Sequence, residues 1–340
     1  MGSKLIDEQQ SDIFDLQFAI VGAGIGGLAS ALALAKKGFK DIHVYENASN
    51  LGFMGAGIQL APNLPKVEFV VKTREGVEQR IIADTLLAAD GVKSITRVAL
   101  LNQINHASEV EDTGQAAYRV LLPREKMQDD PEMMALLDSN QVTRWIDTNF
   151  ASEPSMTYTT KGSKDTMLSV FADFCPLIQR MLDLVPDGQV CEWKLRVQKP
   201  LPTWVHGSVA LVGDACHPTL PHLNQGAAQA VEDAAVLAEV LAKCPGSDLA
   251  SLNKSLCVYE LIRKERASTL VRWAAESGRI LHLGPGKAKE ERDRRFANAN
   301  AGGHHIPDKW ASSDVQEYIY SHDCMQEAAD QFCRLYQSLS

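Results

Sequence analysis

Apolar residues near the start of the chain form first a continuous run and then a helical repeat. Residues 18–21 are uniformly apolar, which is typical of a parallel strand buried on both faces. Small and apolar residues recur over 28–35, and the Lys36-Lys37-Gly38 sequence that follows favours a helix C-terminus. The segment Ile42-His43-Val44-Tyr45-Glu46 predicts a second strand, which ends on an acid. The pattern therefore predicts a β-α-β unit.

The first strand and helix together form an uncharged stretch, residues 16–35, which is long enough to cross a bilayer. The glycines inside it favour the alternative, a buried strand followed by a helix. Residues 1–15 carry acids and no apolar core, so we expect neither a signal peptide nor a transmembrane segment.

A glycine-rich loop joins the predicted strand to the helix. It reads Gly22-Ala23-Gly24-Ile25-Gly26-Gly27, the G-x-G-x-x-G pattern of dinucleotide-binding proteins. Gly22 permits a tight turn, Gly24 lets a pyrophosphate approach the backbone, and Gly27 (or Gly26) lets the helix pack closely. The helix N-terminus offers N–H groups to the phosphates. Glu46, 22 residues after Gly24, would accept hydrogen bonds from ribose hydroxyls, which favours NAD or FAD over NADP.

A second strand-loop-helix pattern lies beyond the middle of the chain. The apolar run 209–212 leads into Gly213-Asp214-Ala215-Cys216-His217-Pro218, and helical periodicity runs from Gly226 to Leu241. An acid at the end of a strand, followed by Gly226-Ala227 at a helix start, predicts a second edge that faces a ligand. We interpret His217 as a hydrogen-bonded loop histidine rather than a catalytic one.

Other segments carry weaker patterns. Runs over 67–71 and 77–82 predict a hairpin, residues 85–89 predict a strand that leads into Asp90-Gly91, and residues 147–167 are polar and predict a loop. The charged segment 252–295 predicts helix, and we interpret its charges, Glu260, Arg263, Lys264, Glu265 and Arg266, as a solvated face.

Composition excludes several classes of function. The formal net charge is −9, so the chain lacks the basic surface that nucleic acid or anionic lipid requires. The seven cysteines are scattered and form no C-x-x-C pair, which argues against a disulfide framework and against zinc. Their pattern fits a reducing compartment, and we expect the cytoplasm. The histidines do not cluster with acids at the sequence spacing of metal ligands, so we expect no metal site.

Three motifs occur in one order: the glycine loop 22–27, Ala89-Asp90-Gly91, and the segment 213–218. With this combination the chain resembles the FAD-dependent aromatic hydroxylases (group A flavoprotein monooxygenases), in particular the salicylate hydroxylase-like branch common in fungi. Flanking stretches match as well: Gly55-Ala56-Gly57-Ile58-Gln59, Ala117-Tyr118-Arg119, Gln225-Gly226-Ala227-Ala228 and Tyr259-Glu260-Leu261-Ile262-Arg263-Lys264.

The resemblance implies an α/β architecture: a Rossmann-like FAD-binding fold of the glutathione-reductase type, with a β-rich substrate layer and C-terminal helices. It implies a first part of the FAD-binding domain over 16–100 and a shortened substrate domain over 101–200. A second part of the FAD-binding domain would cover 201–245, and a C-terminal helical region 246–340.

The resemblance also implies the cofactor contacts. FAD would bind with its ADP part on the first helix and Glu46, its ribityl chain at Asp214, and its isoalloxazine ring facing the backbone of Gly226 and Ala227. The remaining implied cofactor-binding residues are Gly22, Gly24, Gly27, Ala56, Gly57 and Asp90, the last of which would also serve the passing NAD(P)H.

For catalysis the family implies NAD(P)H as co-substrate, O₂, and hydroxylation of a phenolic or related aromatic small molecule in secondary metabolism or aromatic catabolism. Arg119 would anchor a phenolate, and Pro218 would shape the side of the ring where oxygen reacts. The flavin supplies the redox chemistry, while the protein positions the substrate and excludes water.

The chain departs from the family in two places. Only 44 residues separate Glu46 from Asp90, where the family has further helices, a strand and an arginine that contacts FAD. A second stretch, around 147–157, is short where the family carries strands and a tyrosine, a position that Tyr158 could fill. A Rossmann unit without its next crossover should leave a sheet edge and an apolar helix face uncovered.

Two alternatives to the monooxygenase therefore remain open. One is a catalytically silent or truncated flavoprotein remnant, which the two short segments suggest. The other is a flavin oxidoreductase that does not oxygenate its substrate.

Overall fold

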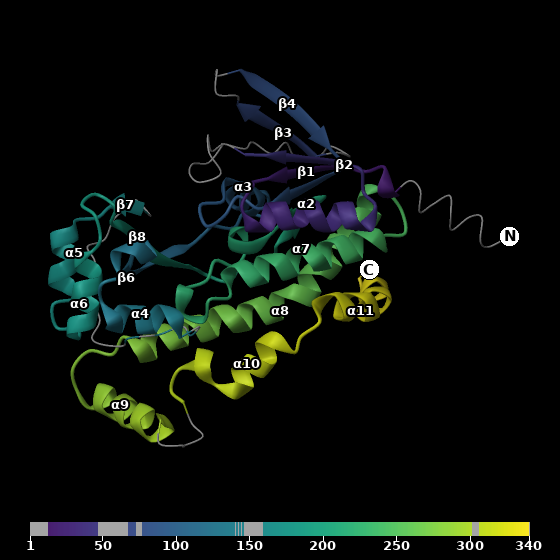
Figure 1. The fold of residues 1–340 in the computed structure, drawn as a ribbon. Coiled ribbons are helices and arrows are strands. Elements are labelled where there is room, and N and C mark those ends of the chain that lie inside the picture. Colours follow the sequence, from purple (N-terminus) through teal and green to yellow (C-terminus); the bar gives the residue numbers. More distant parts are fainter. Residues whose placement is uncertain are drawn as a thin grey trace. The chain divides into compact units, whose positions relative to one another are not determined.

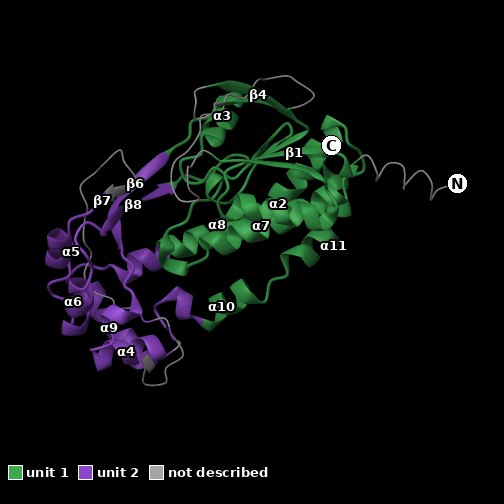
Figure 2. Cartoon of the chain, turned by 45° about the horizontal axis from the view of Figure 1, so that its top comes forward, with its two compact units in different colours: residues 1–109, 198–275, 313–340 green, residues 110–197, 276–312 purple. Residues whose placement is uncertain are grey.

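The computed structural model describes residues 13–46, 67–72, 77–139, 141, 143, 145, 159–300 and 306–339 (Figure 1). Contacts between residues divide the chain into two compact units (Figure 2). Unit 1 comprises residues 1–109, 198–275 and 313–340, and unit 2 comprises residues 110–197 and 276–312.

The centre of unit 1 is a five-stranded sheet in the order β2-β1-β5-β10-β9. Its strands are β2 (Asp41–Tyr45), β1 (Gln17–Val21), β5 (Thr85–Ala88), β10 (Val209–Leu211) and β9 (Val205–His206). The first four run parallel and β9 is antiparallel to β10. All residues of β5 and β10 are buried, as the continuous apolar runs predict for strands covered on both faces.

Helices pack around this sheet in unit 1. In Figure 1, α2 (Ile25–Lys37) and α7 (Gly226–Ala242) run side by side next to the sheet, and α11 (Cys324–Ser338) packs against α7. The remaining elements of the unit are α3 (Ile95–Gln103), α8 (Leu249–Leu281) as far as residue 275, α10 (Ser313–Tyr320), and the 3-10 helices Gly213–Ala215 and Pro221–Leu223. The uncharged stretch 16–35 is thus a buried strand followed by a helix.

A hairpin of unit 1, β3 (Val67–Lys72) and β4 (Glu78–Ala83), is antiparallel, which confirms the predicted strand pair. Among the described residues, no helix has the length and apolar character needed to span a membrane.

Unit 2 contains a three-stranded sheet in the order β6-β8-β7, formed by β6 (Val110–Arg119), β8 (Cys191–Gln198) and β7 (Thr159–Lys161). Its helices are α4 (Pro131–Asp138), α5 (Lys164–Val170), α6 (Pro176–Asp183), α9 (Lys287–Asn300) and the 3-10 helices Arg124–Lys126 and Lys309–Ala311. The loop predicted over 147–167 is wrong from residue 159 onward. Ser163 caps α5 by accepting a hydrogen bond from the N–H of Thr166, so the polar residues there begin a helix.

The glycine loop is held by two very close backbone contacts. Gly22 has a φ of +98°, and a Cβ atom placed on it would lie 2.3 Å from the carbonyl oxygen of Ala89. A Cβ atom on Gly27 would lie 1.9 Å from the carbonyl oxygen of Gly22. No side chain fits at either position, so these two glycines allow α2 to pack on β1 and the loop to pack beside the end of β5.

In the described part of the chain, the outward face of α2 is apolar and exposed. Ile25, Leu28 and Leu32 follow one another at helical spacing, and their side chains are between 49% and 59% exposed. Within the described residues, β2 is an edge of the sheet beside this helix. Both features agree with the expectation drawn from the short span between Glu46 and Asp90.

We predict that Gly27→Ala lowers the free energy of unfolding of unit 1 by more than about 2 kcal/mol, because the added methyl group must displace backbone rather than a side-chain tip. Gly24→Ala is the matched control, since nothing lies within 4 Å of its Cβ position and its φ of −72° suits alanine. Denaturant unfolding followed by circular dichroism measures both variants. Equal stabilities of the two would contradict the close contact.

Candidate functional site

A cavity of about 520 Å³ opens in unit 1 where four segments meet. Its walls are the glycine loop at 24–26, residues 89 and 91 after β5, the loop after β10 at 212–214, and the start of α7 at 224–227, with Thr219, Pro221 and Ala230. Segments far apart in the sequence therefore share one cavity at the carboxyl ends of parallel strands, the place where open α/β sheets bind ligands.

Two helices begin at this cavity. Helix α2 starts after Gly24 and α7 starts after Gln225, and both of these residues line the cavity wall. Within the ranges that the structure describes, neither helix has a side-chain cap, and neither has an acid in its first turn. The N–H groups and the positive ends of both helix dipoles are thus available to a negatively charged ligand.

Glu46 lies beside the glycine loop, as its position after β2 predicts. Its carboxylate Oε2 accepts a hydrogen bond of 2.7 Å from the backbone N–H of Ala23, and its side chain is exposed. Gly22 and Gly27 do not line the cavity but build the turn that brings Gly24 to its wall.

Asp214 carries a carboxylate into the same cavity from the loop after β10. The side chain is open to the cavity space, yet the surrounding protein desolvates it enough to raise its pKa above the ordinary value. The nearby charges of His217 and Arg97 oppose this effect. Gly226 and Ala227 line the cavity as well, whereas Pro218 is buried and is not a lining residue.

Arg97, which the sequence analysis missed, holds this loop from the side of α3. Its buried guanidinium donates hydrogen bonds to the carbonyl oxygens of Ala215 at 3.1 Å, Asp214 at 3.4 Å and Val92 at 2.8 Å. In the sequence, Arg97 could be noticed only by its position three residues after Ser94, the residue that caps α3. A single arginine in an amphipathic helix gives no indication that it is buried.

Asp90 has a structural role at the start of α3. Its carboxylate accepts hydrogen bonds from the hydroxyl of Ser94 at 2.5 Å and from the N–H and hydroxyl of Thr96, both at 3.0 Å. Its neighbours Ala89 and Gly91 line the cavity, and Asp90 is not among the lining residues. A contact between Asp90 and FAD or NAD(P)H stays a prediction.

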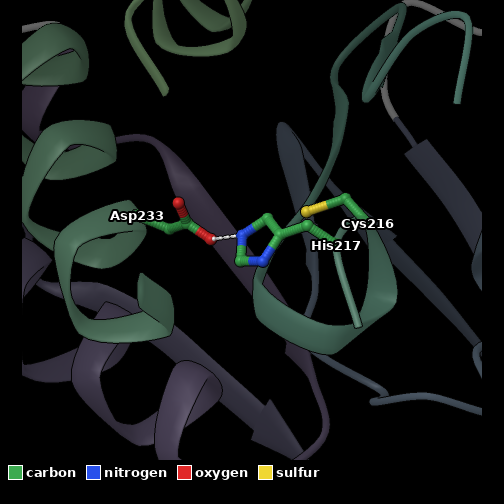
Figure 3. Close-up of side chains that lie close together, drawn as sticks. All are labelled: Cys216, His217 and Asp233. Atoms are coloured by element: carbon green, nitrogen blue, oxygen red, sulfur yellow. Dashed lines mark hydrogen bonds and ion pairs between the residues drawn. The ribbon is translucent and has the colours of Figure 1, made fainter. Parts of the chain in front are cut away.

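Behind the loop lies a buried cluster of charges (Figure 3). One carboxylate oxygen of Asp233 accepts the backbone N–H of Gly213 at 2.9 Å and bonds to His217 Nε2 at 2.6 Å, while the other accepts Arg263 Nε at 2.9 Å. Burial would raise the pKa of Asp233, but His217 and Arg263 lower it to about 2. Burial would lower the pKa of His217, and Asp233 raises it well above its ordinary value. His217 is thus the hydrogen-bonded loop histidine that we expected.

Cys216, His217 and Asp233 each offer an atom that a metal ion could bind, all within 4.8 Å of one another. Figure 3 shows the Cys216 thiol on the far side of the imidazole from Asp233. Both oxygens of Asp233 already accept hydrogen bonds, one of them from a guanidinium. Burial also raises the pKa of the Cys216 thiol, which disfavours the thiolate that would bind a metal. These bonds make the cluster a structural element of the loop.

The prediction that α8 presents a solvated charged face is wrong for two of its arginines. Arg263 is 0% exposed and Arg266 is 6% exposed. Both form ion pairs with Glu232 of α7, and Arg263 also pairs with Asp233. The side of α8 that carries them packs against α7, whose adjacent acids supply the partners.

The remaining residues predicted for the site either do not line the cavity or lie outside the described residues. Arg119 is the last residue of β6 in unit 2, is exposed, and does not belong to the cavity lining. The preceding Tyr118 packs against Phe171, with ring centroids 6.2 Å apart. Ala56, Gly57 and Tyr158 lie outside the described residues.

Comparison with known proteins agrees with this geometry. The sequence model of the FAD binding domain matches residues 63–274, and that of an NAD(P)-binding Rossmann-like domain matches residues 20–73. FAD-dependent monooxygenase OpS4 of Beauveria bassiana (strain ARSEF 2860) is 30% identical over 278 residues, which cover 74% of this chain and 63% of OpS4. The chain thus spans less than two thirds of that relative.

A 3-hydroxybenzoate 6-hydroxylase of Polaromonas naphthalenivorans (strain CJ2) is 27% identical over 374 residues, covering 79% of this chain and 88% of the hydroxylase. This aligned length exceeds the 340 residues of the chain, so the hydroxylase has positions without a counterpart here. That difference agrees with the shortened segments inferred from the sequence.

Among solved structures, the fold is similar to that of CtdE in complex with FAD and substrate 4, with a TM-score of 0.72 and 17% identity over 96% of this chain and 100% of that chain. The predicted Rossmann-like α/β fold is confirmed by this likeness and by the Rossmann-like domain match. The resemblance to FAD-dependent aromatic hydroxylases is confirmed by the named relatives. Because the matched region covers more than half of its residues, the chain belongs to the FAD binding domain family, with FAD as its cofactor.

Proposed function

We propose that the chain is an FAD-dependent monooxygenase that hydroxylates a phenolic or related aromatic small molecule with NAD(P)H and O₂. The observation that carries the proposal is the cavity at which two uncapped helix N-termini and the carboxylate of Asp214 meet. Its wall includes the glycine loop, in a chain whose family binds FAD. The named relatives include monooxygenases and a hydroxylase of 3-hydroxybenzoate.

The residues of the cavity fit FAD. Space is open at the Cβ position of Gly24, so the backbone at the start of α2 is accessible to a pyrophosphate. Gln225 is only 6% exposed and lines the cavity, and its Oε1 atom has no hydrogen-bond partner within the described part of the chain. An unpaired buried acceptor is unfavourable, and an N–H group of a bound flavin ring would satisfy it.

Parts of the wall, together with Glu46 beside the glycine loop, would then each bind one part of the cofactor. The N–H groups of α2 would hold the pyrophosphate, Glu46 the adenosine ribose, and Asp214 the ribityl chain. The N-terminus of α7, at Gly226 and Ala227, would stabilise negative charge on the ring.

Bound FAD supplies the capacity to take electrons from NAD(P)H and to activate O₂. The chain's own residues position the reactants and exclude water. Pro218, a buried residue of the loop after β10, would shape the side of the ring where oxygen reacts. We assign Arg119 as the anchor of the substrate phenolate, because a guanidinium favours the charged form of a phenol.

Within this proposal, residues 101–200 form the substrate domain, residues 16–100 and 201–245 form the FAD-binding domain, and residues 246–340 form the C-terminal helical region. All seven cysteines are free thiols in the structure. Free thiols support a location in a reducing compartment such as the cytoplasm.

The exposed apolar face of α2 favours one second candidate, a flavoprotein that binds FAD without turning over. Within the described residues, β2 is a sheet edge and α2 exposes an apolar face, and both features indicate a unit of reduced stability.

Turnover separates the two candidates. The purified chain, supplied with FAD, is incubated with NADH or NADPH, ¹⁸O₂ and a panel of hydroxybenzoates, and products are identified by mass spectrometry. We expect consumption of reduced nicotinamide that depends on the aromatic compound, with one ¹⁸O atom in the product. Consumption of reduced nicotinamide that yields only hydrogen peroxide would contradict the monooxygenase. Bound FAD without any consumption of reduced nicotinamide would establish the second candidate.

We predict that Arg119→Ala raises the KM for the phenolic substrate about tenfold or more and leaves the FAD dissociation constant within about twofold, because a charge-assisted hydrogen bond to the substrate is lost. Arg124→Ala, another exposed arginine of unit 2, is the control. Steady-state kinetics and FAD titration measure both. A KM equal in the two variants would exclude Arg119 as the anchor.

A further inference from the structure

Asp233 is the point at which three segments of unit 1 join. It lies in the second turn of α7, is fully buried, and accepts hydrogen bonds from Gly213 and His217 of the loop after β10 and from Arg263 of α8. It does not line the cavity. Its partner Gly213 is a lining residue, and so is the adjacent Asp214. Asp233 therefore contacts the loop from behind the wall that faces the cavity.

An ionised carboxylate suits this position better than any uncharged group. Its two oxygens can accept all three donors at once, whereas a carboxamide has one acceptor oxygen and turns an NH₂ group toward a donor. Arg263 satisfies its other donors on α7, with Glu232 Oε2 at 2.5 Å and Gln229 Oε1 at 2.6 Å. The charge on Asp233 is thereby balanced within the core rather than by solvent.

The loop is also held from its opposite side. Arg97 donates to the carbonyl oxygens of Asp214 and Ala215, while Asp233 accepts the N–H of Gly213. Buried charges thus fix the peptide group that precedes Gly213 and the two peptide groups that follow Asp214. Such double fixation limits the rotation that would turn the Asp214 side chain away from the cavity.

We propose that Asp233 is a positioning residue for the cofactor: its carboxylate holds residues 213–217 in the conformation that turns Asp214 into the cavity. This inference rests on the proposed function, because the ligand at Asp214 is FAD. Asp233 acts through the loop and does not touch the cofactor. Loss of its charge should therefore weaken FAD binding by more than it weakens the fold.

The variant Asp233→Asn tests the proposal against Glu239→Gln as matched control. Glu239 is a buried acid of the same helix, and it pairs with Lys37 and Lys243 away from the cavity. Both substitutions replace a paired carboxylate of α7 by its amide. The measurements are the FAD dissociation constant, the thermal midpoint without FAD, and the visible circular dichroism of the flavin at saturating FAD.

We expect Asp233→Asn to raise the FAD dissociation constant at least tenfold and to change the circular dichroism bands of the bound flavin. We expect Glu239→Gln to lower the thermal midpoint but to leave the dissociation constant within twofold and the flavin bands unchanged. A stability effect alone would not alter the bands of a saturated, folded protein. Equal dissociation constants and bands in the two variants would overturn the proposal while FAD binding by the unchanged chain still supports the proposed function.

His217→Gln covers the case in which Asp233→Asn does not fold. This substitution changes the contact between residue 217 and Asp233 from the loop side, and the glutamine amide still offers a hydrogen-bond donor. A raised dissociation constant with altered flavin bands supports the proposal, and unchanged values overturn it. If the unchanged chain binds no FAD, both the proposed function and this inference fail.

Discussion

Two helices of unit 1 begin at one cavity with their first N–H groups left without side-chain caps, and the surrounding structure depends on this arrangement. Most helices satisfy these groups with a serine, threonine, asparagine or aspartate, as Ser94 does for α3. Helices α2 and α7 instead follow Gly24 and Gln225, and their positive ends lie at the cavity. An anionic ligand would supply the missing acceptors. The chain has a net charge of −9, so attraction for such a ligand must be local.

Contacts outside the cavity hold its walls in place. Gly22 and Gly27 let β1, α2 and the end of β5 approach more closely than any side chain permits. Arg97 and Asp233 hold the loop after β10 from two sides. Burying an unpaired charge costs free energy because the charge loses its hydration. In this core the buried charges are paired or hydrogen-bonded, and these contacts join segments that lie far apart in the sequence. In the described part of the chain, the outer face of α2 is apolar and exposed, with Ile25 among its exposed residues.

The sequence predicted those parts of the site that depend on backbone geometry. A glycine loop between a buried strand and a helix has few alternatives, so its place at the cavity and the position of Glu46 followed from spacing. Residues that act through long-range pairing were not predictable in this way. Arg263 meets Asp233 across 30 positions of sequence, and on a helix with regularly spaced charges it was indistinguishable from a solvated residue. The strand and helix from residue 159 onward were missed because the serine that caps the helix is also a typical loop residue.

The central claim is that the cavity between α2 and α7 binds FAD, and the most direct test is the visible spectrum of the chain after FAD is added and the excess is removed. We predict a retained flavin spectrum near one FAD per chain. We also predict that it is lost in Asp214→Ala, which removes a polar partner at the cavity wall, but kept in Glu265→Ala, which changes an exposed acid of α8. A colourless protein, or equal retention by the two variants, would contradict the account.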